Sequence, residues 1–220
     1  MLAFRPALRA GTGRACRRVV SINRYIMVIS PSEYIKKCLK IDFDNSVENI
    51  IDTGASIIIF EKGTMPIEMG EMINCFYFII YGLVRGYYID DDGNEVTKCF
   101  VYENGFFGSE CYRTKDTSTF FVDCLEECKC IKLPYFLIQK IMSIDQRVNQ
   151  LIHSMYLNEI GKLEDRTRKL LLLTAEERYI FFCREYPNLQ RRLQLKYIAS
   201  YIGIKAASMS RIRKKLKNQI

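Results

Sequence analysis

The segment 195–216 most constrains the fold, because its pattern predicts a helix-turn-helix whose second helix is strongly basic. Ala199 provides a small side chain where two helices would cross closely. Gly203 provides the turn, where a positive φ is cheap only without a Cβ. Helical spacing places six apolar residues on the inner faces: Ile198, Ile202, Ile204, Met209, Ile212 and Leu216. The outward stripe of the second helix then consists of Ala206, Ala207, Ser210, Arg211 and Lys214.

Small side chains beside an arginine suit a helix that approaches base edges in a DNA major groove. The alternative is an ordinary helical hairpin with a solvated basic face. After Glu185 the chain has no acidic residue but nine basic ones. A solvated helix usually carries charges of both signs, whereas a surface that binds a polyanion carries mainly positive charge. The charge pattern therefore favours nucleic acid as the binding partner.

The rest of the chain has a different charge balance. Residues 1–24 carry six arginines and no acid, and the middle carries 18 basic against 25 acidic residues. At 220 residues and 49% hydrophobic content, the chain can hold two modest domains. An acidic body with a basic end predicts a sensing or oligomerising domain joined to a nucleic-acid-binding one. No apolar run approaches the roughly 18 residues of a membrane span, so we expect a cytoplasmic protein without a membrane partner.

Residues 1–26 are arginine-rich and superficially match a transit peptide, but we interpret them as an extension or disordered tail. The nine cysteines form no CxxC pair, and their one cluster is Cys124, Cys128 and Cys130. We expect reduced thiols packed as small apolar side chains. An iron–sulfur or redox role is the alternative, although four ligands cannot be assembled locally. We therefore expect no cofactor.

Residues 27–143 are predicted to form a β roll, because short apolar runs alternate with glycines. The predicted strands are 56–60, 76–80, 83–89, 96–101, 118–122 and 128–133. The segment Asp90-Asp-Asp-Gly-Asn94 predicts a hairpin turn.

Residues 144–173 are predicted to form a long helix. One stripe of this helix would hold Val148, Ile152, Met155, Tyr156, Ile160 and Leu163. We favour a dimerisation helix, and the alternative is that the stripe packs only on its own β domain. Residues 174–220 would form the helix-turn-helix domain, which begins with a capping box of Thr174 and Glu177 and breaks at Pro187.

The order of β roll, long helix and helix-turn-helix resembles the Crp/Fnr family of bacterial transcription regulators over roughly residues 30–220. The resemblance is most specific in three segments, Ile198-Ala-Ser-Tyr-Ile-Gly-Ile204, Ser210-Arg-Ile-Arg-Lys-Lys215 and Glu176-Glu-Arg-Tyr179. The residues of these segments look like those of the Bacteroidota branch of the family. It implies an α+β fold with a cyclic-nucleotide-binding-like β roll that senses an effector. It also implies a homodimer on a partly palindromic DNA site, with RNA polymerase as an expected partner.

The resemblance assigns the base-reading arginine to Arg211, where bidentate contact with a guanine is expected. Ala206 and Ala207 fall on neighbouring base-reading positions, where relatives that bind the cyclic-AMP-receptor site carry arginine and glutamate. This chain should therefore read another sequence. The phosphate-contacting positions fall on Lys196, Lys205 and Ser208, and Ser210, Lys214 and Lys215 complete the expected DNA-binding set. The chain also stops before the β-hairpin wing of longer relatives, so we expect weaker backbone contact or a contribution from the basic tail.

The effector region departs from cyclic-nucleotide-binding relatives. The segment Phe106-Phe-Gly-Ser-Glu110 resembles their Gly-Glu pair, but Thr117-Ser-Thr119 stands where the phosphate-neutralising arginine is expected, and Arg113 comes too early. A buried phosphate without a cation carries a heavy desolvation cost, which disfavours cyclic AMP. The candidate pocket is Gly105, Phe107, Gly108, Ser109, Glu110, Ser118 and Thr119. A simpler interpretation is that Glu110 is a loop-end carboxylate and that the glycines form turns.

Catalysis is not predicted, because His153 is the one histidine and no phosphate loop, zinc signature or dinucleotide fingerprint occurs. Two classes therefore remain. The first is a sequence-specific DNA-binding transcription regulator. The second is a ligand-sensing β-roll module whose helical tail binds a protein partner. The identity of any small-molecule effector stays open.

Overall fold

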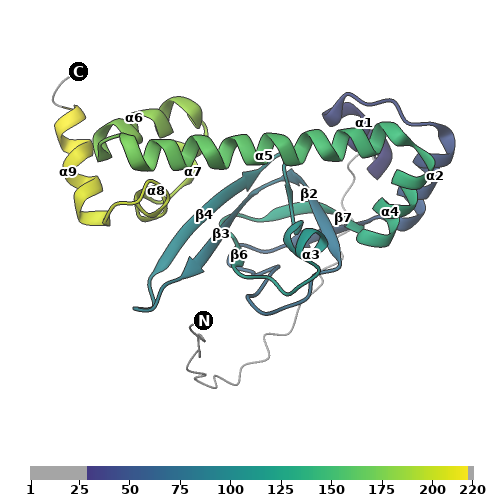
Figure 1. Ribbon diagram of the computed structural model, residues 1–220, viewed down its shortest axis with the longest axis horizontal. Helices are drawn as coiled ribbons and strands as arrows, with labels where there is room; N and C mark the ends of the chain where they lie inside the picture. The colour runs from purple at the N-terminus through teal and green to yellow at the C-terminus, as the bar shows by residue number, and fades with distance from the viewer. Residues whose placement is uncertain (1–28, 218–220) are drawn as a thin grey trace.

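Two antiparallel sheets form the middle of the molecule in the computed structural model, which describes residues 29–217 (Figure 1). The segment 1–26, predicted to be an extension, lies outside the described residues. One sheet has the strand order β1-β7-β2-β5 and the other β4-β3-β6. The strands are β1 (Ser56–Phe60), β2 (Cys75–Tyr81), β3 (Leu83–Ile89), β4 (Glu95–Tyr102), β5 (Phe106–Phe107), β6 (Phe121–Cys124) and β7 (Cys128–Pro134).

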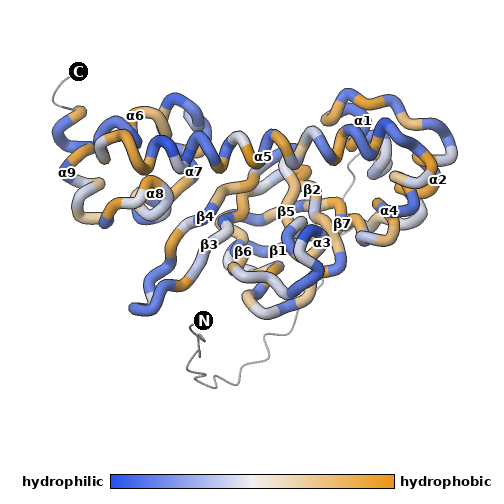
Figure 2. Tube along the Cα trace, in the orientation of Figure 1, coloured by the Kyte–Doolittle hydropathy of each residue, from blue (hydrophilic) through white to orange (hydrophobic). Residues whose placement is uncertain are grey.

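The hairpin that joins β3 to β4 turns at the acidic segment, as predicted. Oδ1 of Asp90 accepts hydrogen bonds from the backbone N–H groups of Asp92 and Asn94. Gly93 adopts φ +81°, which favours glycine. Figure 2 shows this hairpin tip as strongly hydrophilic.

The predicted strand 118–122 is wrong, because β6 begins only at Phe121. Oγ of Ser118 donates a hydrogen bond to the carbonyl oxygen of Phe120 at 2.8 Å, and the N–H of Thr119 donates to the carboxylate of Glu110. These local polar contacts hold residues 118–120 outside the strand, with a bend at residues 119 and 120. The apolar run from Phe120 to Val122 concealed this bend in the sequence.

Nine helices occur among residues 29–217, and none of them is long and apolar enough to cross a membrane. They are α1 (Pro31–Leu39), α2 (Asn45–Gly54), α3 (Glu110–Thr114), α4 (Tyr135–Ile144), α5 (Gln146–Leu172), α6 (Ala175–Glu185), α7 (Leu189–Arg192), α8 (Leu195–Tyr201) and α9 (Ala206–Lys217). The sequence did not predict α1 and α2, which pack with α4 on the four-stranded sheet. Their inward side chains, such as Val47 and Ile51, share a core with Phe78 and Ile131.

The long helix α5 runs across the whole width of the molecule above the β roll (Figure 1). Asp145 caps its N-terminus by accepting a hydrogen bond from the N–H of Arg147. The predicted apolar stripe divides in two. Val148 is 6% exposed and packs in the core of the roll, whereas Ile160 and Leu163 are 50% and 54% exposed. The first half of α5 therefore covers its own β roll, and the second half extends beyond that core.

Helices α6 to α9 form the reading head, our name for residues 174–217. The capping box of Thr174 and Glu177 opens it as predicted. Ile198, Ala199 and Met209 are at most 1% exposed at the centre of its core, and Gly203 turns the chain with φ +71°. The predicted α+β fold with a β roll, a long helix and a helix-turn-helix is confirmed.

Candidate nucleic-acid interface

The outer face of the reading head gathers the residues predicted to bind DNA. The exposed ones are Lys196, Lys205, Ala206, Ala207, Ser210, Arg211, Lys214 and Lys215, and Ser208 is half-buried. Met209, on the opposite side of α9, packs in the same core as Ile198 of α8. Because the buried side fixes the helix, its outward stripe is presented as one rigid surface.

Arg211 is free to engage a ligand. Its guanidinium makes one weak contact, a 3.4 Å hydrogen bond from Nη2 to Oγ of Ser208, and no carboxylate pairs with it among residues 29–217. Ala206 and Ala207 occupy the first turn of α9 and leave room for close approach. Lys215 instead pairs with Glu176 at 2.6 Å, so the lysines of this face are not equivalent.

The candidate effector pocket is closed by its own side chains. The carboxylate of Glu110 accepts hydrogen bonds from the N–H and the Oγ1 of Thr119, at 3.0 and 2.8 Å, and from Oγ of Ser118 at 3.2 Å. The cavity beside it has a volume of about 10 Å³, which is room for one water molecule at most. It is lined by Ile67, Ile73, Gly108, Glu110, Cys111, Ser118 and Phe120.

The other predicted pocket residues serve the backbone and the core. A Cβ on Gly108, which has φ +92°, would come within 2.6 Å of the Cys75 carbonyl oxygen. A Cβ on Gly105 would come within 2.9 Å of the Tyr102 carbonyl oxygen. Phe107 stacks on Tyr77 with ring centroids 4.8 Å apart, and Ser109 precedes α3. Of the seven predicted residues, three line the cavity and Thr119 closes it through Glu110.

Sequence reasoning missed Lys98 as a cation of this region. Its Nζ lies 3.3 Å from the ring centroid of Phe120 and 5.5 Å from that of Tyr88. Burial lowers the pKa of Lys98, and the charge of Glu110 opposes that shift. Nothing in the strand pattern distinguishes this lysine from a solvated one, so no local signal could have found it.

The cysteine cluster belongs to the core between the two sheets. Cys124, Cys128 and Cys130 are at most 1% exposed, and every cysteine between residues 29 and 217 is a free thiol. Burial raises the pKa of Cys130 to about 12. Packing accounts for these side chains, and in residues 29–217 no group of three or more candidate ligands is placed to hold a metal ion.

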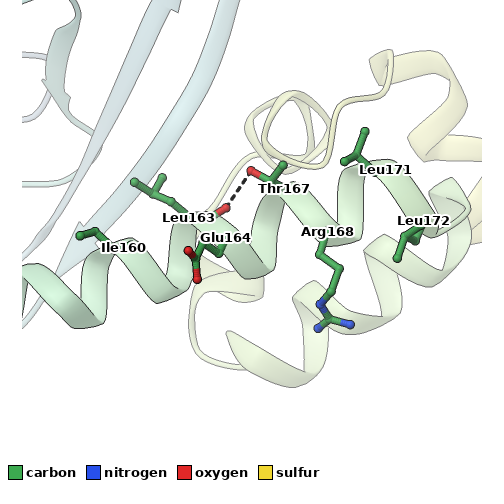
Figure 3. Close-up of a pocket in the computed structure, with 7 residues that line it drawn as sticks. All are labelled: Ile160, Leu163, Glu164, Thr167, Arg168, Leu171 and Leu172. Carbon is green, nitrogen blue, oxygen red and sulfur yellow. Dashed lines mark hydrogen bonds between the residues drawn. The ribbon is translucent and has the colours of Figure 1, made fainter.

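The second half of α5 presents an exposed apolar face (Figure 3). A shallow groove of about 510 Å³ runs along it, lined by Ile160, Leu163, Glu164, Thr167, Arg168, Leu171 and Leu172. Leu171 and Leu172 are 78% and 74% exposed. The hydroxyl of Thr167 donates a hydrogen bond to the carbonyl oxygen of Leu163 at 2.9 Å and is therefore satisfied within the helix. The face is therefore largely apolar.

Comparison with known proteins supports this architecture. Residues 57–145 match the cyclic nucleotide-binding domain family. The chain is 22% identical over 184 residues to an anaerobic regulatory protein of Pasteurella multocida, across 79% of this chain and 66% of the relative, just under two thirds of its length.

Solved structures show the same fold. FixK2 from Bradyrhizobium japonicum superimposes with a TM-score of 0.68 at 21% identity, covering 75% of this chain and 85% of that chain. A transcriptional regulator of the Crp/Fnr family from Eubacterium rectale gives a TM-score of 0.67 at 13% identity, covering 81% and 85%. The chain therefore contains a segment that matches the cyclic nucleotide-binding domain family, is similar to an anaerobic regulatory protein, and shares the fold of a transcriptional regulator of the Crp/Fnr family.

Proposed function

We propose that this protein is a sequence-specific DNA-binding transcription regulator that acts as a homodimer on a partly palindromic site without cyclic AMP. The observation that carries this proposal is the outer face of α9, where small side chains flank an exposed arginine that no carboxylate neutralises among the described residues. Such a face can approach base edges and donate two hydrogen bonds to a guanine. A regulator of this kind works in the cytoplasm, with RNA polymerase as its protein partner.

The apolar face of α5 supports the homodimer. Two copies of this face can bury each other, because side chains such as Ile160 and Leu163 recur at helical spacing. A two-fold axis along paired α5 helices would present two reading heads to one DNA duplex. Paired half-sites multiply the affinity of a reading head that is too small to bind tightly alone.

The closed region around Glu110 supports independence from cyclic AMP. A nucleotide phosphate and ribose need a cavity far larger than about 10 Å³. Thr119 and Ser118 already satisfy the carboxylate that would hold the ribose in cyclic-nucleotide-binding relatives. Any small-molecule effector of this protein would therefore bind by other contacts.

Selection of bound sites from random duplex DNA tests the proposal, with the full chain at near-physiological salt and Arg211→Ala in parallel. We expect an enriched inverted repeat that is the same with and without added cyclic AMP. We expect Arg211→Ala to lose about 1–3 kcal/mol on that site while non-specific binding is kept, because a bidentate contact to one base is removed.

The alternative function, a helical tail that binds a protein, predicts no enriched sequence at all. Equal loss by Arg211→Ala on every DNA sequence would contradict base reading by this residue. Enrichment only in the presence of cyclic AMP would contradict the independence from the nucleotide.

A further inference from the structure

The strand β4 lies at the edge of its sheet, so its outward backbone groups need partners from elsewhere. The reading head supplies one of them. Oγ of Ser200 accepts a hydrogen bond from the N–H of Thr97 at 2.8 Å and donates one to the carbonyl oxygen of Glu95 at 3.0 Å. The helix α8 therefore docks on the open edge of the β roll of its own chain.

Arg166 on α5 binds the same edge and the end of α8 together. Its guanidinium donates hydrogen bonds to the carbonyl oxygens of Lys98 and Thr97 on β4 and to that of Tyr201 on α8. The Thr97 and Tyr201 contacts measure 2.9 and 3.0 Å, and the guanidinium carbon lies 4.4 Å from the ring centroid of Tyr201. One planar side chain therefore joins the long helix, the β roll and the reading head.

The planar fork of an arginine is needed for this junction. A lysine ammonium is a compact point charge that lacks the planar fork with which the guanidinium reaches carbonyl groups on two elements. Without the guanidinium, these part-buried carbonyl oxygens would lose their donors, which is costly. A second arginine reinforces the joint, because Nε of Arg178 donates to the carbonyl oxygen of Ile202 at 2.8 Å and its Nη1 donates to that of Leu173 at 2.7 Å.

We propose that Arg166 is a positioning residue that sets the angle between the long helix and the reading head, and hence the half-site spacing that a dimer accepts. This inference rests on the proposed function. Paired α5 helices would define the two-fold axis, so the angle of each head on α5 sets the distance between the two α9 helices. Half-sites one turn of DNA apart, about 34 Å, demand that this distance be held.

The first test is independent of DNA and uses hydrogen exchange in the full chain. The Thr97 amide is protected by Ser200 only while the head is docked. We expect this amide to exchange about tenfold faster in Arg166→Met than in the wild type, with the Ile131 amide in the central strand β7 unchanged. Arg184→Met, an exposed arginine of α6, serves as the matched control and should leave both amides unchanged.

The second test selects DNA sites with variable spacers between the half-sites. We expect the wild type to enrich one spacing, and Arg166→Met to accept several spacings with the same half-site sequence. Arg166→Lys should fall between them, and it replaces Arg166→Met in both tests if that variant does not fold. Unchanged Thr97 exchange, or faster exchange with an unchanged single spacing, would overturn the positioning role. Failure of the wild type to select any DNA would instead overturn the proposed function, and with it the spacing role.

Discussion

At the scale of single residues, the basic side chains of α9 differ in the ion pairs that they must break to bind a phosphate. Lys214 is exposed and makes no ion pair among the described residues, whereas Lys215 pairs with Glu176. The pair is solvent-exposed and therefore weak, but it must be exchanged for the phosphate. The two neighbouring lysines should therefore contribute unequally to the salt dependence of DNA binding.

We expect Lys214→Ala to reduce the slope of log K against log salt by about 0.9, the value for one released counterion. Lys215→Ala should change the slope less, because its ammonium group is already partly neutralised. Fluorescence anisotropy on the selected site at several salt concentrations measures both slopes. A shift in sequence preference in either variant would contradict a purely phosphate-contacting role.

At the scale of elements, α5 serves two surfaces with one continuous helix. Its first half packs in the β-roll core through Val148, and its second half carries the exposed apolar face beyond that core. An exposed apolar patch of this kind marks an interaction surface in soluble proteins. One half of the helix therefore stabilises the fold of its own chain, and the other half offers a surface for pairing with another chain.

We expect Leu163→Glu to raise the dimer dissociation constant about tenfold or more, because pairing would bury an unpaired carboxylate. Sedimentation at several concentrations measures the constant. Asn158→Glu adds the same charge roughly on the opposite side of α5, given about 100° per residue, and should leave the constant unchanged. A dimer that tolerates Leu163→Glu as well as it tolerates Asn158→Glu would exclude this face.

At the scale of the whole molecule, the reading head and the β roll share a core and a set of ion pairs. Leu83 of β3 packs among the apolar residues of the head, together with Phe100. The guanidinium of Arg192 binds the carboxylates of Glu103 and Glu126 with four contacts of 2.6 to 2.9 Å. The orientation of the head is therefore set by its own β roll as well as by α5.

This docking should depend on pH through Glu103. Burial alone would raise the pKa of Glu103, but the hydrogen bonds from Arg192 and from the N–H of Gly82 outweigh burial and hold the pKa below its usual value. A lowered pKa in the folded state stabilises the fold above the unfolded value of about 4.3. That stabilisation is lost as the pH falls through the folded pKa.

We expect the carboxyl carbon of Glu103 to titrate below its usual range in an NMR experiment. In Arg192→Met the same titration should shift to higher pH, because burial is then less opposed. Arg184→Met is the control that removes an arginine elsewhere in the head. An identical titration of Glu103 in Arg192→Met and the wild type would show that Arg192 does not hold this carboxylate.

The sequence by itself determined the features that depend on near neighbours. The period of apolar residues predicted α5 and the helix-turn-helix, and short apolar runs broken by glycines predicted most strands. The cap at Thr174 and the turn at Asp90 followed from side-chain chemistry. These features are readable because the groups that satisfy one another lie within a few residues.

The tertiary structure alone decided which surfaces and charges remained available. Periodicity reports that one side of α5 is apolar, but only the extent of the β roll decides where that side is covered. Arg85 is a buried charge that lies between the rings of Tyr87 and Tyr197 and pairs with Asp123. Arg166 donates hydrogen bonds to carbonyl groups as far as 69 residues away in the sequence. Such partners meet only when the chain has folded, and no local pattern encodes their distance.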